Sequence, residues 1–283
     1  KLANFWAISS KVTKNLNNLG LKSIAGSYDL FFVDIWGVVH NGLSIFEEAI
    51  IALNELEKIK KDYVLLTNAP RPNFSVKKFL TKMGISENIS NKIYTSGQAS
   101  LDYLLKNYKN KKFFHLGPSR DFDLFVSFKE NKINEINESE YIICTGLFDE
   151  YNQDLNYYKE ILHREKNKKM ICTNPDLVVD RGEKREYCAG SIAKIFEELG
   201  GQVEYFGKPY PNVYSQSIKV ENKKVLCIGD NLNTDIKGAN IQNFSSLLIS
   251  NGIHREEMKN KNLNDLFKEY NVNVDYIQNS LKW

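Results

Sequence analysis

The regular alternation of short apolar runs with helical patterns is the feature that most constrains how this chain can fold. Nine such runs, rich in β-branched and aromatic residues, recur along it: YDLFFVD (28–34), DYVLLTN (62–68), NKIYTS (91–96), KKFFHLG (111–117), YIICTG (141–146), KMICTN (169–174), VEYFG (203–207), KVLCIGD (224–230) and SSLLIS (245–250). Runs of this kind are typical of strands that are buried on both faces of a parallel sheet. The alternation therefore predicts a doubly wound α/β fold.

Two of the intervening helices are clear from the sequence. The segment SIFEEAIIALNELEKIKK carries an apolar stripe at helical spacing, and Ser44 and Glu47 form a capping-box pattern that predicts a helix start at Ser44. The segment SIAKIFEELGG carries a similar stripe and is expected to stop at Gly200.

The number of strands indicates two sheets rather than one. Nine strands are many for a single sheet of ordinary size, and the chemical motifs described below use only the outer portions of the chain. We therefore expect an inserted domain. The predicted core comprises residues 1–96 and 204–283, and an α/β cap comprises residues 97–203.

Composition narrows the class of protein. No apolar run approaches the roughly 20 residues of a membrane-spanning helix, and residues 1–22 are too polar for a secretory signal. The chain begins at Lys1, which predicts that an initiator Met or a tag has been trimmed. The four cysteines have no C-x-x-C spacing, which favours reduced core thiols and a cytoplasmic protein. The net charge of +3, with Lys-rich tracts near helical ends, argues against a nucleic-acid partner.

Polar residues follow four of the predicted strands directly. In an open parallel sheet, ligands bind beyond the carboxyl ends of the strands, so these side chains are expected to converge. The residues are Asp34, Thr67 with Asn68, Lys208, and Asp230 with Asp235.

This set suits a phosphate ester. Asp34 can attack phosphorus to form an aspartyl-phosphate. Neighbouring carboxylates would repel Asp34 unless a cation intervened, so we predict Mg²⁺ with Asp34 and Asp230 as direct ligands. Thr67 and Asn68 offer neutral donors to the phosphoryl oxygens, and Lys208 offers positive charge.

Each of these residues also has a structural interpretation. An aspartate after a strand is usually a turn residue or a helix cap, and Asp235 could simply start the next helix. A lone Lys208 would more often be a surface lysine. Taken singly, the structural interpretation is favoured for each, but chance explains the ordered set poorly.

The ordered set resembles the four motifs of the haloacid dehalogenase (HAD) superfamily. The matching segments are D-x-W-G-V at 34–38, LLTNAPR at 65–71, GKPYPNVY at 207–214 and GDNLNTDIKGA at 229–239. The predicted insertion, with CTNPDLVVDRG at 172–182, resembles the α/β cap of the class IIA phosphatases of that superfamily. The resemblance covers nearly the whole chain and implies a Rossmann-like core, with Asp34 as nucleophile, the Trp36 backbone carbonyl as a further Mg²⁺ ligand, and Asp235 as support for the metal site.

The sequence departs from the family pattern at Trp36. The family normally has an aspartate there, which protonates the leaving oxygen and later activates water. An indole N–H donates only, so general acid–base help worth typically ~10²–10⁴-fold is missing from this position. Trp36 is either a packing residue or an apolar wall that excludes water from the leaving group.

Three explanations for the departure stay open. His40, six residues after the nucleophile, could take over the proton, although an ordinary structural histidine is about twice as probable on sequence grounds. The substrate could carry a leaving group, such as an acyl or aryl phosphate, that departs unassisted. Alternatively, the protein could bind a phosphorylated ligand and hydrolyse little.

Three further residues are candidates for substrate contact. Arg71 could clamp a second anionic group, although pairing with a surface carboxylate is slightly favoured. Asn174 and Asp176 of the NPD segment resemble the family's specificity loop on the cap, and N-P-D is also an ordinary turn sequence.

The sequence thus predicts a Mg²⁺-dependent phosphohydrolase that acts on a small phosphorylated metabolite through Asp34. The alternative is a non-catalytic or weakly active phosphoester-binding or regulatory protein on the same scaffold. Substrate identity and oligomeric state, a homodimer included, are left open.

Overall fold

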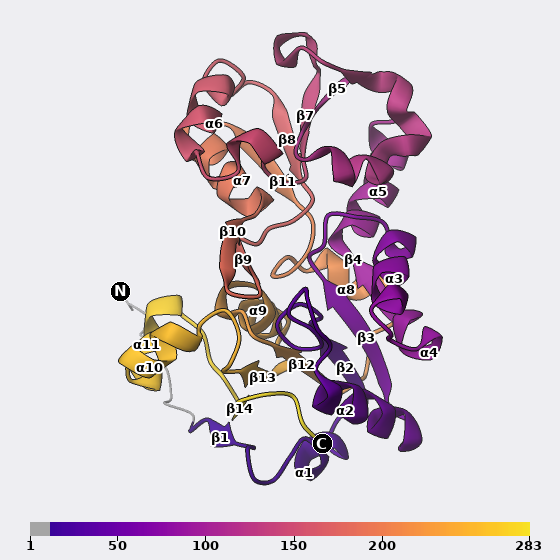
Figure 1. Ribbon diagram of the computed structural model, residues 1–283, viewed down its shortest axis with the longest axis vertical. Helices are drawn as coiled ribbons and strands as arrows, with labels where there is room; N and C mark the ends of the chain where they lie inside the picture. The colour runs from indigo at the N-terminus through magenta and orange to yellow at the C-terminus, as the bar shows by residue number, and fades with distance from the viewer. Residues whose placement is uncertain (1–11) are drawn as a thin grey trace, which may run out of the picture.

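The computed structural model describes residues 12–283, and the predicted core before residue 12 lies outside this range. Two parallel sheets are arranged one above the other along the long axis of the molecule (Figure 1). The lower sheet is formed by the first and last parts of the chain, and the upper sheet by the middle part. We refer to them as the core sheet and the cap sheet.

The core sheet has seven strands, all paired in parallel. In spatial order they are β1 (Lys14–Asn15), β14 (Tyr276–Gln278), β13 (Ser245–Ile249), β12 (Val225–Gly229), β2 (Leu30–Val33), β3 (Asp62–Thr67) and β4 (Ile93–Thr95). The chain order reverses between β12 and β2, the two central strands. Ligands in such sheets bind at a switch point of this kind.

Helices cover both faces of the core sheet. They are α1 (Lys22–Ala25), α2 (Glu47–Lys58), α3 (Asn73–Lys82), α4 (Glu87–Ser90), α8 (Asn212–Ser217), α9 (Lys237–Gln242), α10 (Arg255–Asn260) and α11 (Leu263–Tyr270). Strand β2 shows why two covered faces are needed, because all four of its residues are buried. Phe31 packs in the cluster that contains Leu53 of α2, whereas Phe32 packs with Tyr214 of α8 on the other face.

The cap sheet has five parallel strands. In spatial order they are β11 (Gln202–Tyr205), β8 (Lys169–Cys172), β7 (Tyr141–Cys144), β5 (Phe113–Leu116) and β6 (Lys132–Ile133). Its helices are α5 (Ser96–Asn107), α6 (Leu155–Leu162) and α7 (Ala189–Glu198). A separate antiparallel hairpin, β9 (Val178–Arg181) and β10 (Lys184–Tyr187), projects from the cap toward the core (Figure 1). We call residues 178–187 the cap hairpin.

The predicted fold class is confirmed, and each of the nine predicted strands is present. The core sheet takes its strands from residues 14–95 and 225–278, and the cap sheet from residues 113–205. The domain boundaries at 96/97 and 203/204 stay a prediction. Strands β1, β6, β9, β10 and β14 lack a long apolar run and were not expected.

The predicted start of the first helix is wrong. Helix α2 begins at Glu47 with Phe46 as its N-cap, and Ser44 does not cap it. The Asn41 side chain accepts hydrogen bonds from the backbone N–H groups of Leu43 (2.9 Å) and Ser44 (2.8 Å), so Ser44 belongs to an Asx turn in the preceding loop. The end at Gly200 is confirmed, since α7 stops just before it and Gly200 has a φ of +95°.

The four cysteines are free and buried, as expected. Across residues 12–283, every helix is too short or too polar to cross a lipid bilayer.

Candidate active site

Three carboxylates converge at the carboxyl end of the two central core strands. Asp34 follows β2 and Asp230 follows β12, and these strands pair directly, with Val33 opposite Ile228. Asp235 lies one turn farther on, in a π-helical turn (Leu232–Ile236) that leads into α9. Their ligand oxygens all lie within 4.8 Å of one another.

Lys208 is the cation of this cluster, and its side chain is almost fully buried. Its ammonium group donates hydrogen bonds to Asp235 Oδ1 (2.7 Å), Asp34 Oδ1 (2.9 Å) and the Leu66 carbonyl (2.6 Å). Burial opposes the charged form, but the attraction of the two carboxylates outweighs it and raises the pKa of Lys208 above its usual range. All three donors of the ammonium group are thus used.

One lysine does not neutralise three carboxylates. Burial, followed by repulsion from Asp34, raises the pKa of Asp235 to about 7 and raises that of Asp230 well above its usual range. Burial also raises the pKa of Asp34, although Lys208 opposes this. A cluster of this kind is short of positive charge, so a divalent cation would stabilise its ionised form.

The surroundings also fit a small, oxygen-seeking cation. Carboxylate oxygens are the ligands that Mg²⁺ and Ca²⁺ prefer. Asp230 is held by the backbone N–H of Ile253 (2.9 Å) and is enclosed by glycine backbone. A Cβ on Gly37 would lie 2.3 Å from Asp230 Oδ2, and the φ of +87° at Gly37 also disfavours a side chain.

Thr67 and Asn68 follow β3 beside this cluster. Asn68 Oδ1 accepts from the Lys208 backbone N–H (2.8 Å), and Asn68 Nδ2 donates to the Lys208 carbonyl (2.8 Å) and to Asp176 Oδ1 (3.0 Å). The first two bonds hold the backbone of Lys208 against the end of β3, and the third links the core to the cap. Thr67 is buried at the pocket floor.

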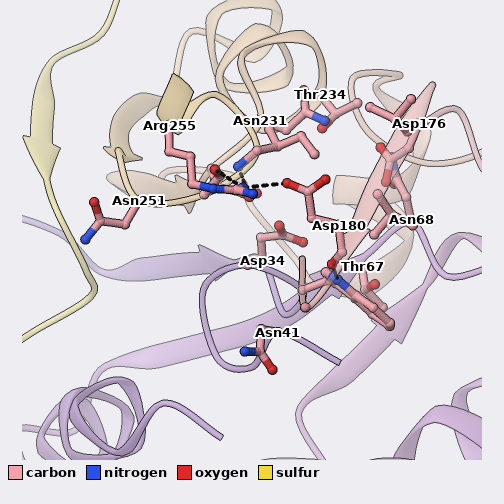
Figure 2. Close-up of a pocket in the computed structure, with 18 of the residues that line it drawn as sticks. Asp34, Asn41, Thr67, Asn68, Asp176, Asp180, Asn231, Thr234, Asn251 and Arg255 are labelled. Atoms are coloured by element: carbon pink, nitrogen blue, oxygen red, sulfur yellow. Dashed lines mark hydrogen bonds and ion pairs between the residues drawn. The ribbon is translucent and has the colours of Figure 1, made fainter. Parts of the chain in front are cut away.

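A pocket of about 480 Å³ opens above these residues, between the core and the cap. Figure 2 shows the core side chains Asp34, Thr67 and Asn68 entering it, with Asp176 and Asp180 contributed by the cap. An apolar part is lined by Trp36, Leu43, Phe46, Val178 and Val179. The pocket therefore joins a charged floor to an apolar wall.

The cap hairpin docks on the core at the edge of this pocket. Trp36 Nε1 donates to the Asp180 carbonyl (2.5 Å), and the Gly182 N–H donates to the Asn41 carbonyl (3.1 Å). Arg255 donates to the Asp180 carboxylate (2.6 Å; Figure 2). Burial opposes ionisation of Asp180, but hydrogen bonds from Arg185 and Arg255 outweigh it and hold its pKa below its usual range.

The Trp36 side chain joins the core to the cap. Its ring packs edge-on against His40 (centroids 5.0 Å apart), and the Arg181 guanidinium of the cap hairpin lies 5.0 Å from the ring centroid. Its face also lines the pocket. Both interpretations of Trp36, as packing residue and as apolar wall, therefore have a geometric basis.

Besides Asp235, which contacts Lys208 outside the pocket lining, three predicted candidates do not line the pocket. His40 is 2% exposed, its Nδ1 accepts from the Gly42 N–H (2.8 Å), and burial lowers its pKa to about 4. Arg71 pairs with Asp123 (2.6 Å), which is the carboxylate alternative that the sequence slightly favoured. Asn174 accepts from the Asp176 N–H (3.1 Å) and shapes the turn.

Several lining residues were not predicted from the sequence. They are Asn41, Leu43, Phe46, Val178, Val179, Asp180, Glu183, Asn231, Thr234, Asn251 and Arg255, among others. Asp180 belongs to the predicted cap motif and lies two residues before Gly182, which begins the two-residue hairpin turn, so a hairpin signal in the sequence could have pointed to it. Arg255 gives no comparable signal, because only the tertiary fold brings α10 to the pocket.

Comparison with known families finds two matches along the chain. Residues 31–127 match the family described as haloacid dehalogenase-like hydrolase, and residues 205–282 match the one described as HAD-hydrolase-like. The segment between the matches, residues 128–204, lies within the predicted cap except for its last residue.

Individual relatives extend the similarity over most of the chain. The 5'-nucleotidase YutF of Bacillus subtilis is 21% identical over 239 residues, with 82% of this chain and 90% of that protein covered. Phosphoglycolate phosphatase 2 of Arabidopsis thaliana is 24% identical over 273 residues, with 85% and 89% covered. A crystal structure of a haloacid dehalogenase-like hydrolase from Brucella suis superimposes with a TM-score of 0.81 at 29% identity and covers 93% of this chain and 98% of that one.

Proposed function

Because this chain belongs to the haloacid dehalogenase-like hydrolases, we propose that it is a Mg²⁺-dependent phosphohydrolase that transfers the phosphoryl group of a small metabolite to Asp34 and then to water. The observation that carries the proposal is the convergence of Asp34, Asp230 and Lys208 at the floor of one pocket, with Asp235 held against Lys208 beside them. These residues come from strands far apart in the sequence.

Asp34 is the nucleophile in this proposal. Lys208 donates to Asp34 Oδ1, which favours the carboxylate form and leaves Oδ2 available to attack phosphorus. Lys208 also supplies positive charge beside the transferring group. Asp235 holds the ammonium group at 2.7 Å and accepts from the Asn231 N–H (3.1 Å), so it positions Lys208.

Asp34, Asp230 and the Trp36 backbone carbonyl would hold Mg²⁺, with Asp235 as support. Bound Mg²⁺ would neutralise the carboxylates and stabilise the negative charge that develops on the phosphoryl oxygens. The identity of the residue 36 side chain does not affect a backbone ligand.

The pocket supports a small organic phosphate as substrate. The relatives named above are a 5'-nucleotidase and a phosphoglycolate phosphatase, both of which take small phosphorylated compounds. The phosphoryl group would lie on the charged floor, and the remainder of the ester would contact Leu43, Phe46 and Val178. The docked cap excludes water from the pocket until the aspartyl-phosphate has formed.

The test is phosphate release from a panel of phosphate esters in the presence and absence of Mg²⁺. The wild type is expected to hydrolyse some esters of the panel, and to do so only when Mg²⁺ is present. Asp34→Asn keeps the shape of the side chain but removes the nucleophile, so turnover is expected to vanish. Sustained turnover by Asp34→Asn would refute the proposal.

A second candidate is supported by Trp36. With a side chain there that cannot transfer a proton, the scaffold could bind a phosphoester and hydrolyse it little. The same panel separates the two candidates when Trp36→Asp is assayed beside wild type. An inert wild type together with an active Trp36→Asp favours the binding protein.

A further inference from the structure

Hydrolysis of an alkyl phosphate in this pocket requires a proton donor, and the Trp36 side chain cannot serve as one. The leaving oxygen of an alkyl phosphate needs a proton as the P–O bond breaks. Among the carboxyl groups contributed by the cap, Asp180 is held ionised by Arg185 and Arg255, and Glu183 is exposed at the turn of the cap hairpin. The remaining one is Asp176.

The backbone of Asp176 is fixed by its own loop. Its N–H donates to Asn174 Oδ1 (3.1 Å), and its carbonyl accepts from the Gly190 N–H (3.0 Å) in the first turn of α7. A Cβ on Gly190 would lie 2.4 Å from the Asp176 carbonyl oxygen, so the loop and the helix are in close contact. This support points the Asp176 carboxyl group into the pocket, beside Asn68 (Figure 2).

The hydrogen bond from Asn68 places Asp176 next to the phosphoryl site. Asn68 Nδ2 has two hydrogens, and it uses one on the Lys208 carbonyl and the other on Asp176 Oδ1. A phosphoryl oxygen that takes a hydrogen bond from Asn68 must therefore replace Asp176 as its acceptor. The carboxyl group that is displaced stays adjacent to the bound ester.

The surroundings of Asp176 move its pKa toward neutrality. Burial raises its pKa to about 6, Lys208 and the Asn68 hydrogen bond oppose this, and Asp235 adds to it. The negative charge of Asp176 also acts on Asp34 and on the Cys188 thiol. When an incoming phosphate takes the Asn68 hydrogen bond away from Asp176, one of the effects that lower the pKa of Asp176 is removed. The pKa of Asp176 therefore rises further when the ester binds.

We propose that Asp176 of the cap is the general acid and base of this enzyme, in place of the side chain at position 36; the inference rests on the proposed function. In the first step an Asp34 oxygen bonds to phosphorus and the bond from phosphorus to the ester oxygen breaks. The electron pair goes to the ester oxygen, which takes the proton of the Asp176 carboxyl group and leaves as an alcohol.

The second step reverses the proton transfer. A water oxygen attacks the phosphorus of the aspartyl-phosphate, and the Asp176 carboxylate takes the proton that the water loses. The bond between phosphorus and Asp34 breaks, which restores the Asp34 carboxylate and releases inorganic phosphate. Asp176 is protonated again and ready for the next ester.

The dependence on the leaving group tests this assignment. An alkyl phosphate such as glycerol phosphate needs the proton, whereas 4-nitrophenyl phosphate has a leaving group that departs without it. In Asp176→Asn, which keeps the acceptor for Asn68, kcat/KM for the alkyl ester is expected to fall ~10²–10⁴-fold, and kcat/KM for the aryl ester much less. A burst of 4-nitrophenolate is also expected, because phosphorylation of Asp34 stays fast while its hydrolysis is slow.

Two further variants separate proton transfer from a structural role. Asp180→Asn changes another cap carboxyl group of the same pocket. It is expected to lower kcat/KM for the alkyl ester and for the aryl ester in the same proportion. Trp36→Asp in the Asp176→Asn background is expected to restore the ratio of alkyl to aryl kcat/KM.

The inference and the proposed function fail in different ways. If Asp176→Asn lowers kcat/KM for both esters equally, or for neither, the role of Asp176 is overturned, and the proposal of a phosphatase is unaffected. A wild type without turnover of either ester overturns the phosphatase itself.

Discussion

The core and the cap both contribute carboxyl groups to one pocket, but the two regions hold them in different ways. In the core, Asp34 and Asp230 directly follow buried, paired strands, and Asp235 lies in the π-helical turn after the second of them. Asp34 and Asp235 share one lysine. In the cap, Asp176 lies on a loop and contacts Asn68 of the core, and Asp180 lies on the cap hairpin and contacts Trp36 and Arg255.

The difference indicates which half of the site depends on docking of the cap. The carboxylates of the core half find their partners in the core sheet and in Lys208, whose backbone is held in place by Asn68. The core half is therefore complete before a substrate arrives. The cap half depends on contacts between the two domains, those of the cap hairpin with Trp36 and Arg255 and that of Asp176 with Asn68. We expect changes in the core carboxylates and Lys208 to abolish chemistry, and changes in the docking contacts of the cap hairpin to alter affinity.

Among Lys208→Met, Asp180→Asn and Trp36→Phe, the largest effect is expected from Lys208→Met. The change removes the ammonium group beside the transferring phosphoryl group and leaves Asp34 and Asp235 without their shared cation. A loss of about 10²–10³-fold in kcat is expected, as for removal of one preorganised donor. Steady-state kinetics at saturating Mg²⁺ measure it. Lys223→Met, which removes an exposed pair with Asp62, is the control and is expected to leave kcat unchanged.

Metal binding should stabilise the core half in a pH-dependent way. The pKa of Asp235 is raised to about 7 from 3.8. A raised carboxyl pKa stabilises the fold at low pH, and this stabilisation is lost as the pH rises from about 4 through 7. In metal-free protein the melting temperature is therefore expected to fall over that range. A fixed Mg²⁺ concentration that is 100 times the Kd at pH 7.5 adds ~2.7 kcal/mol there, or several degrees. The same concentration adds less at pH 5, because protonation of the carboxyl groups weakens metal binding. An equal Mg²⁺ effect at both pH values contradicts the prediction.

The core was predictable from the sequence because its signals are local. Each core strand that carries a site residue is a continuous apolar run with the polar residue directly after it, as in LFFV before Asp34 and VLCIG before Asp230. The rule that such ends converge in a parallel sheet then placed the residues without any knowledge of contacts.

The cap contacts were not predictable, for physical reasons. The cap hairpin has polar, partly exposed strands with no apolar run. Its ion pair to Arg255 spans 75 residues of sequence, and no local pattern encodes such a pairing. The loop position of His40 made it one candidate proton carrier, although an ordinary structural histidine was favoured, and the structure packs its ring against Trp36 and Phe79.

A smaller effect is expected from Asp180→Asn, which weakens docking of the cap hairpin. The neutral amide loses the charge-assisted hydrogen bonds from Arg185 and Arg255. Because these arginines are partly exposed, we expect a loss of about 1.4 kcal/mol in binding free energy, which corresponds to a tenfold rise in KM. The kcat is expected to stay nearly unchanged. Arg120→Gln removes an exposed ion pair to Asp149 elsewhere on the cap and serves as the matched control. A tenfold loss in kcat at constant KM would place Asp180 in the chemistry instead.

The smallest effect is expected from Trp36→Phe, which keeps an aromatic wall but removes the N–H that binds the Asp180 carbonyl. A neutral hydrogen bond contributes about 1 kcal/mol, so KM is expected to rise about fivefold. The double variant with Asp180→Asn decides whether the two contacts act together. If both act by docking the same hairpin, the second change costs little once the hairpin has detached, and the combined rise in KM falls short of the product of the single effects. Independent, fully multiplicative effects would mean that Trp36 contacts the substrate directly and that its bond to the cap is incidental.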